Sequence, residues 1–179
     1  MSYRNQYNVS QKMKNYITRI YFVFLFLLVF EGCENVLSDE ENNLPPDNQD
    51  KVTIKQGVWG NVWFWEGNFM PSTDNSSDGK ITAVERDIYI YEATTDSMVE
   101  PSGGTFHTKI NSQLILVIRS DASGFYQISL SPGKYSFFVK EDSLFYANLW
   151  DGEGHIQSAI VTEDSITKRQ IDIDYNAVY

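Results

Sequence analysis

The stretch GFYQISLSPGKYSFFVK, residues 124–140, contains two short runs in which every second side chain is apolar or aromatic. A period of two is typical of half-buried β-strands, and Pro132-Gly133 marks a turn between the two runs. We therefore predict a tight hairpin here. The side chains expected to share one core face are Tyr126, Ile128, Leu130, Tyr135, Phe137 and Val139.

The same alternation recurs across the last two thirds of the chain, and turn-forming residues separate the runs. No window after Cys33 shows a convincing helical stripe. Short strands at this spacing predict a single all-β sandwich of seven strands. The predicted strands lie near 56–65, 84–92, 114–120, 124–130, 134–141, 155–162 and 166–175.

The order of these motifs resembles the carboxypeptidase regulatory-like domain, a transthyretin-like (prealbumin-like) β-sandwich. The likeness covers roughly residues 56–176, and its most specific part is the run from Gly124 to Tyr135. Segment 92–113 and the tryptophan-rich first strand depart from the family pattern. The resemblance implies that residues 56–179 form a non-catalytic accessory module.

The N-terminal residues 1–32 have the layout of an export signal. Four basic residues precede an apolar run at 20–30, which is too short to span a membrane, and the only cysteine, Cys33, follows it. This layout resembles a bacterial lipoprotein signal, and Glu31 in place of a small residue resembles the relaxed signals of Bacteroidetes lipoproteins. We expect lipid on the Cys33 thiol. The alternative is an ordinary signal peptide beside a free cysteine, and translation could start at Met1 or at Met13.

Residues 33–55 are rich in acidic residues, asparagine and proline, which predicts a flexible, disordered tether. The acids of 38–41 resemble the signal that directs Bacteroidetes lipoproteins to the outer face of the outer membrane. We therefore expect a cell-surface protein held at the outer membrane by lipid. A plain solvated linker would have the same composition.

The charge of the chain argues against nucleic acid as a partner. The chain has 14 Lys and Arg against 24 Asp and Glu, and four of those basic residues but only one acid precede Cys33, so the remainder carries a net charge of −13. Phosphate binding needs clustered basic residues. The two histidines, His107 and His155, fit no zinc-protease motif, and no nucleophile elbow is present. We expect no catalysis, and we interpret Asp151 beside His155 as a turn.

Tryptophans on the first strand supply a candidate binding surface for a glycan or a protein. Trp59, Trp63 and Trp65 share one face of a regular strand, and Tyr89 and Tyr91 would extend it. Indole rings in a row can stack on sugar rings or on a partner's side chains. The alternative is that segment 92–113 folds over these rings and buries them.

Residues 74–85 follow the spacing of an EF-hand calcium loop. The ligands would come from Asp74, Ser76, Asp78, Lys80 (through its carbonyl) and Glu85. The flanking sequence lacks an entering helix, and residues 84–91 predict a strand that would carry Glu85 away. A calcium-stabilised adhesin-like domain is therefore a further alternative to a polar surface loop, and no other cofactor is expected.

Overall fold

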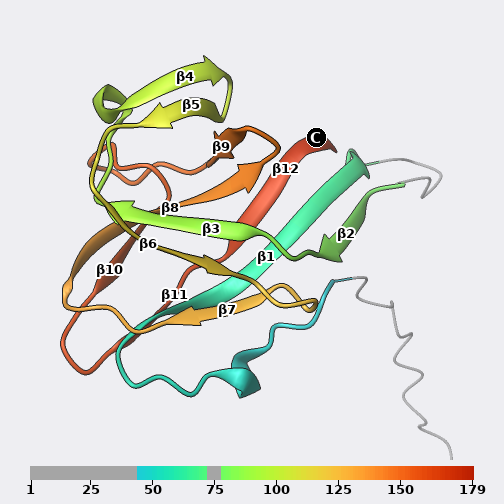
Figure 1. The fold of residues 1–179 in the computed structure, drawn as a ribbon. Helices are drawn as coiled ribbons and strands as arrows, with labels where there is room; N and C mark the ends of the chain where they lie inside the picture. The colour runs from blue at the N-terminus through green and yellow to red at the C-terminus, as the bar shows by residue number, and fades with distance from the viewer. Residues whose placement is uncertain (1–43, 72–77) are drawn as a thin grey trace, which may run out of the picture. The chain divides into compact units, whose positions relative to one another are not determined.

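The first sheet is built around one long central strand, β1 (Gly57–Asn68), as the computed structural model shows for the described residues 44–71 and 78–179 (Figure 1). β11 (Ile166–Lys168) and β12 (Ile171–Val178) run parallel to β1. β7 (Phe125–Ile128) and β2 (Lys80–Ala83) run antiparallel to it. Val58 pairs with both Thr167 and Ile128, so β1 has neighbours on both of its edges.

The second sheet has seven strands and is antiparallel throughout. Its order is β4 (Val99–Gly103), β5 (Phe106–Ile110), β9 (Leu144–Tyr146), β8 (Gly133–Glu141), β3 (Asp87–Glu92) and β6 (Leu114–Arg119), and β10 (Ser158–Val161) pairs with β8. Two short 3-10 turns, η1 (Gln49–Lys51) and η2 (Asp96–Met98), are the only helical elements among the described residues.

The prediction of an all-β sandwich is confirmed. The described residues form sheets of five and seven strands, which is more than the seven strands predicted. β2, β4, β5 and β9 were not expected, and the predicted strand 166–175 is divided into β11 and β12. The additional strands are short, and short strands carry too few alternations to be read from sequence.

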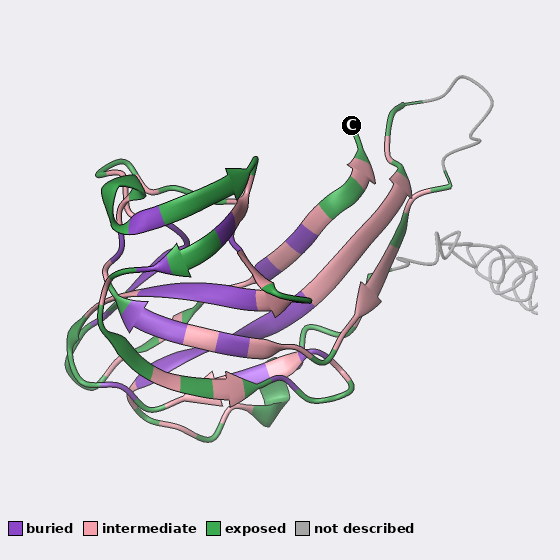
Figure 2. Cartoon of the chain, turned by 45° about the horizontal axis from the view of Figure 1, so that its top comes forward, coloured by how far each residue is buried: buried purple, intermediate pink, exposed green. Residues whose placement is uncertain are grey.

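The main core lies between the two sheets, and the predicted core face is correct. Tyr126, Leu130, Phe137 and Val139 are buried there, with Ile128 and Tyr135 packed partly buried against them. β1 contributes Val58 and Val62, while β12 contributes Ile171 and Ile173. Figure 2 shows the buried bands along the strands that face this core.

The predicted hairpin at Pro132-Gly133 is wrong. β7 pairs with β1 in the first sheet, whereas β8 pairs with β3, β9 and β10 in the second. The chain therefore crosses from one sheet to the other between residues 128 and 133. Because the inner faces of the two sheets pack against each other, every second side chain of β7 and of β8 still points into one shared core. Gly124 precedes this crossing at φ 78°, with its carbonyl accepting from Val62 N at 2.9 Å.

A second, smaller core lies on the other face of the seven-stranded sheet. Val99 of β4 and Ile110 of β5 pack there with Tyr91, Phe138, Ala147 and Ile156. Segment 92–113 therefore covers this sheet and its tyrosines, not the tryptophans of β1.

Residues 47–56, which belong mostly to the expected tether, lie against the first sheet. Asn48 is buried and donates to Asn61 Oδ1 at 2.7 Å, and Gln56 donates to the carbonyl of Leu130 at 2.8 Å. Asn48 adopts the left-handed conformation (φ 58°), which asparagine tolerates better than most residues. The domain boundary predicted at residue 56 therefore leaves out part of the fold.

Candidate functional site

The most concentrated set of titratable groups in the described residues surrounds the turn that follows Trp150. Ligand atoms of Asp151, Glu153 and His155 lie within 4.8 Å of one another. The Lys134 ammonium, from β8, lies among them at 3.1 Å from Asp151 Oδ2, 2.6 Å from Glu153 Oε2 and 3.4 Å from His155 Nδ1. A lysine cation thus occupies the position that a metal ion would take.

Asp151 organises this turn through hydrogen bonds from the backbone. Its Oδ1 accepts from Glu153 N at 2.9 Å and from His155 N at 2.8 Å, and its Oδ2 accepts from Ser158 Oγ at 2.8 Å. The hydrogen bond from His155 N is the largest of several that hold the pKa of Asp151 well below its usual range. This agrees with the interpretation of Asp151 and His155 as a structural turn.

The same lysine also shifts the titration of its other partner. The hydrogen bond from Lys134 lowers the pKa of Glu153, and the reciprocal bond raises the pKa of Lys134. Lys134 is therefore the cation that both carboxylates of the cluster share.

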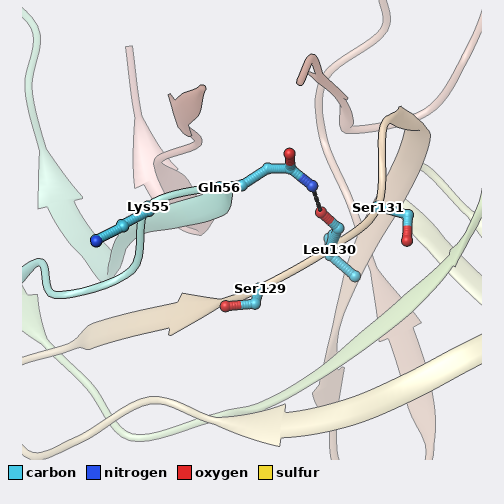
Figure 3. A pocket seen from close by; sticks show the side chains of 5 residues that line it. All are labelled: Lys55, Gln56, Ser129, Leu130 and Ser131. Carbon is cyan, nitrogen blue, oxygen red and sulfur yellow. Dashed lines mark hydrogen bonds between the residues drawn. The ribbon is translucent and has the colours of Figure 1, made fainter. Parts of the chain in front are cut away.

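A shallow hollow on the surface is lined by Lys55, Gln56, Ser129, Leu130 and Ser131 (Figure 3). Gln56 Nε2 donates across it to the Leu130 carbonyl, as the dashed line in the figure shows. The Lys55 side chain points away from the other four residues in this view. The hollow therefore lies where the residues just before β1 are hydrogen-bonded to those that follow β7.

The three tryptophans share the outer face of β1 as predicted, yet they do not form one open surface. Trp59 is 7% exposed, packing 6.4 Å from the Phe125 ring, with Lys168 Nζ 5.0 Å above the indole. Trp63 and Trp65 are half-buried. Trp65 Nε1 donates to Asp172 Oδ1 at 3.0 Å, and its ring lies 5.2 Å from Phe69.

The predicted extension of this surface by two tyrosines is wrong. Tyr89 and Tyr91 lie in β3 of the other sheet and pack around Phe145, at 5.1 and 6.3 Å between ring centres. Strand membership explains the error, because equal alternation on two strands does not reveal whether they share a sheet.

The calcium-loop residues are only partly within the described chain, since Asp74 and Ser76 lie outside it. Asp78 Oδ1 accepts from the backbone N of Asn68 at 2.8 Å. Lys80 begins β2 and pairs with Glu66 at 3.7 Å, while Glu85 lies beyond that strand, 3.5 Å from Arg119. The structure thus gives Asp78 and Glu85 separate partners. Cys33 also lies outside the described residues, so its lipidation stays a prediction.

Two features were missed by sequence reasoning. His107 is 3% exposed, and neither ring nitrogen has a hydrogen-bond partner in the described structure. Strand β6 forms an edge of the second sheet, and it exposes Leu114, Ile115 and Val117. The apolar run at 114–118 predicts a strand. Whether that strand lies at the edge of a sheet depends on pairing with residues that are distant in the sequence.

Comparison with known proteins adds no relative. No family model, no curated protein and no solved structure matches the chain. Within residues 44–71 and 78–179, no helix has the length and apolar character needed to cross a membrane.

Proposed function

We propose that this chain is a surface-exposed outer-membrane lipoprotein whose β-sandwich is a non-catalytic interaction module. Lipid on Cys33 would hold the chain at the membrane, and the sandwich would present a binding edge to the outside. The sandwich fold supports a kinship with the carboxypeptidase regulatory-like, transthyretin-like domains, which we include in the proposal.

The observation that carries the proposal is the apolar edge strand β6. Leu114, Ile115 and Val117 are 45%, 36% and 44% exposed, on a strand whose only partner among the described strands is β3. Edge strands in soluble proteins are usually protected by charge, proline or a covering segment, because unpaired backbone groups recruit another strand. An unprotected edge therefore favours a binding role over a purely structural one.

The charge cluster favours the same conclusion. Lys134 forms ion pairs with both Asp151 and Glu153 and also contacts His155 Nδ1. A reaction at these side chains would require Lys134 to move away first and to lose its contacts with Asp151, Glu153 and His155.

Labelling cells with a fatty-acid analogue tests the anchor. We expect label on the wild-type chain and none on Cys33→Ala, with Ser38→Ala labelled like the wild type as the control. Equal labelling of the wild type and Cys33→Ala would overturn the anchor. Protease added to intact cells tests exposure, and we expect replacement of Asp39, Glu40 and Glu41 by alanine to protect the chain.

A glycan-binding module is the second candidate. The Trp65 indole is half-buried beside Asp172, and Gln170 Nε2 donates to the same carboxylate oxygen at 3.1 Å. An aromatic ring flanked by a carboxylate and an amide suits a sugar ring with its hydroxyl groups. Binding on a glycan array that is lost in Trp65→Ala and kept in Trp150→Ala would favour this candidate, and an array without signal would remove it.

A further inference from the structure

Strand β6 has one edge without a partner in the described residues. Its inner edge pairs with β3, from Asp87 opposite Arg119 to Tyr91 opposite Leu114, and Figure 2 shows it at the rim of the sheet. Backbone N–H and C=O groups of an edge strand point alternately outward, so a further strand can add there.

The side chains of this edge are those of a strongly β-forming strand. Residues 114–118 are Leu-Ile-Leu-Val-Ile, without proline, glycine or charge. The single charged residue of the strand, Arg119, pairs with Asp87 at 2.8 Å and with Glu85 at 3.5 Å. In a chain of net charge −10, residues 114–118 form an uncharged strip, along which two copies can approach without placing like charges directly opposite each other.

We infer that the partner of β6 is the β6 of a second copy of this chain, paired antiparallel about a two-fold axis at Val117. This register places Val117 opposite Val117, Leu116 opposite Ile118 and Ile115 opposite Arg119. In this register, the core-facing side chains of one copy lie opposite the core-facing side chains of the other copy. Parallel pairing would instead set the two Arg119 side chains next to each other, which is unfavourable.

Two sandwiches joined in this way form a closed, symmetric dimer with one continuous sheet. The ladder is five residues long, so the contact is smaller than the roughly 1,200 Å² of a stable interface. A concentration-dependent dimer is therefore expected. The inference deepens the proposed interaction function by naming the partner, and it does not depend on the lipid anchor.

The test uses the full chain with Cys33→Ala, which removes the only native thiol, in a mild detergent at less than one chain per micelle. Sedimentation over a concentration series measures the mass. Val117→Lys places two like charges on the axis, and Ile160→Lys, at a residue 55% exposed on β10, is the matched control. Val117→Cys, treated with a short thiol crosslinker, reports the register, with Ile160→Cys as its control.

We expect reversible dimers in the parent and in Ile160→Lys, and at least a tenfold weaker association in Val117→Lys. We expect crosslinking in Val117→Cys and little in Ile160→Cys. A parent that stays monomeric, an unchanged Val117→Lys dimer or equal crosslinking at both cysteines would overturn the inference. A monomeric chain that captures a different protein in a Val117-dependent manner would overturn it while leaving the proposed interaction function intact.

Discussion

The Asn48 side-chain amide donates to Oδ1 of Asn61 across 2.7 Å, and both side chains are buried on the outer face of the first sheet. Asn61 Nδ2 in turn donates to the Asp47 carbonyl at 2.7 Å. This pair fastens the segment before β1 to the centre of that strand, so a stretch that reads as tether becomes part of the folded domain.

Asn61→Ala is therefore expected to destabilise the domain by about 1–3 kcal/mol, because it removes two hydrogen bonds, the one accepted from Asn48 Nδ2 and the one donated to the Asp47 carbonyl. Urea unfolding followed by tryptophan fluorescence measures the change. Asn176→Ala, at an exposed position of β12, is the control and should unfold like the wild type. Equal stability of Asn61→Ala and Asn176→Ala would show that the segment does not depend on this bond.

Phe137→Ala is expected to cost about 3–5 kcal/mol, because the ring is fully buried between the two sheets. Phe125→Ala, on the outer face of β7, should cost clearly less, and so should Ile128→Ala, whose side chain is only partly buried. Thermal or urea unfolding of the three variants gives the order. If Phe125→Ala proved the most damaging of the three, the assigned core face would be reversed.

Local alternation was enough to predict which side chains of 124–140 face the core, but not which strands pair. The parity of Tyr126 and Phe137 is a property of each strand alone. The pairing of β7 with β1 depends on residues more than 60 positions away, for example Gln127 opposite Trp59. The turn at Pro132-Gly133 fits a hairpin and a crossing between sheets equally well, so only the packing of the sheets decides.

In the candidate site, too, the local part could be predicted from the sequence and the long-range contacts could not. The turn at Asp151 is local and could be predicted from its neighbours. Long-range packing decides the rest. It brings Lys134 of β8 to the turn, and it buries His107 beside the second core. An edge strand such as β6 and a central strand such as β8 both read as apolar runs, so exposure of the edge was not predictable.

Lys134→Ala is expected to convert the charge cluster into a weak zinc site. Removing the ammonium leaves Asp151, Glu153 and His155 with ligand atoms within 4.8 Å of one another, a set that suits Zn²⁺. Calorimetric titration should show Zn²⁺ binding in Lys134→Ala that is absent from the wild type. Adding His155→Ala to the variant should abolish that binding. Equal zinc affinity in the wild type would mean that the lysine does not hold the site closed.

Asp151→Ala should lower the unfolding midpoint, because the backbone of the turn loses its acceptor. The pKa of Asp151 is lowered in the fold, so its contribution is present above its ordinary pKa and is lost as the pH falls through the acidic range. The difference between wild type and Asp151→Ala should therefore shrink toward low pH. A constant difference from neutral to strongly acidic pH would contradict this origin.

Calcium is not expected to bind the wild-type chain tightly at 74–85. Asp78 already accepts a hydrogen bond from the backbone N–H of Asn68. β2 separates Asp78 from Glu85, and Glu85 pairs with Arg119. Titration calorimetry should show no binding tighter than millimolar and no rise in melting temperature. Tighter binding that disappears in Asp78→Ala, but persists in the control Asp142→Ala, would restore the calcium interpretation.

His107 should make the domain sensitive to mild acid. Burial lowers the pKa of this imidazole, and Asp96 opposes the shift only in part. The unfolded chain therefore takes up a proton at a higher pH than the folded chain does, so stability falls as the pH drops below about 6.5 toward the folded-state pKa. Neither ring nitrogen has a hydrogen-bond partner in residues 44–71 and 78–179, and the ring packs edge-on against Phe138 at 5.8 Å. A protonated ring would therefore have no acceptor among these residues.

His107→Leu removes this titration while filling a similar volume. At pH 8 the variant should be as stable as the wild type or up to about 2 kcal/mol more stable, because two unpaired buried nitrogens are gone. Between pH 7 and pH 5 the urea midpoint of the wild type should fall more steeply than that of the variant. His155 is present in both proteins, so it cancels from the comparison. Parallel pH profiles would contradict this account. They would show that His107 finds a hydrogen-bond partner in solution and that the fold does not depend on a neutral imidazole at this position.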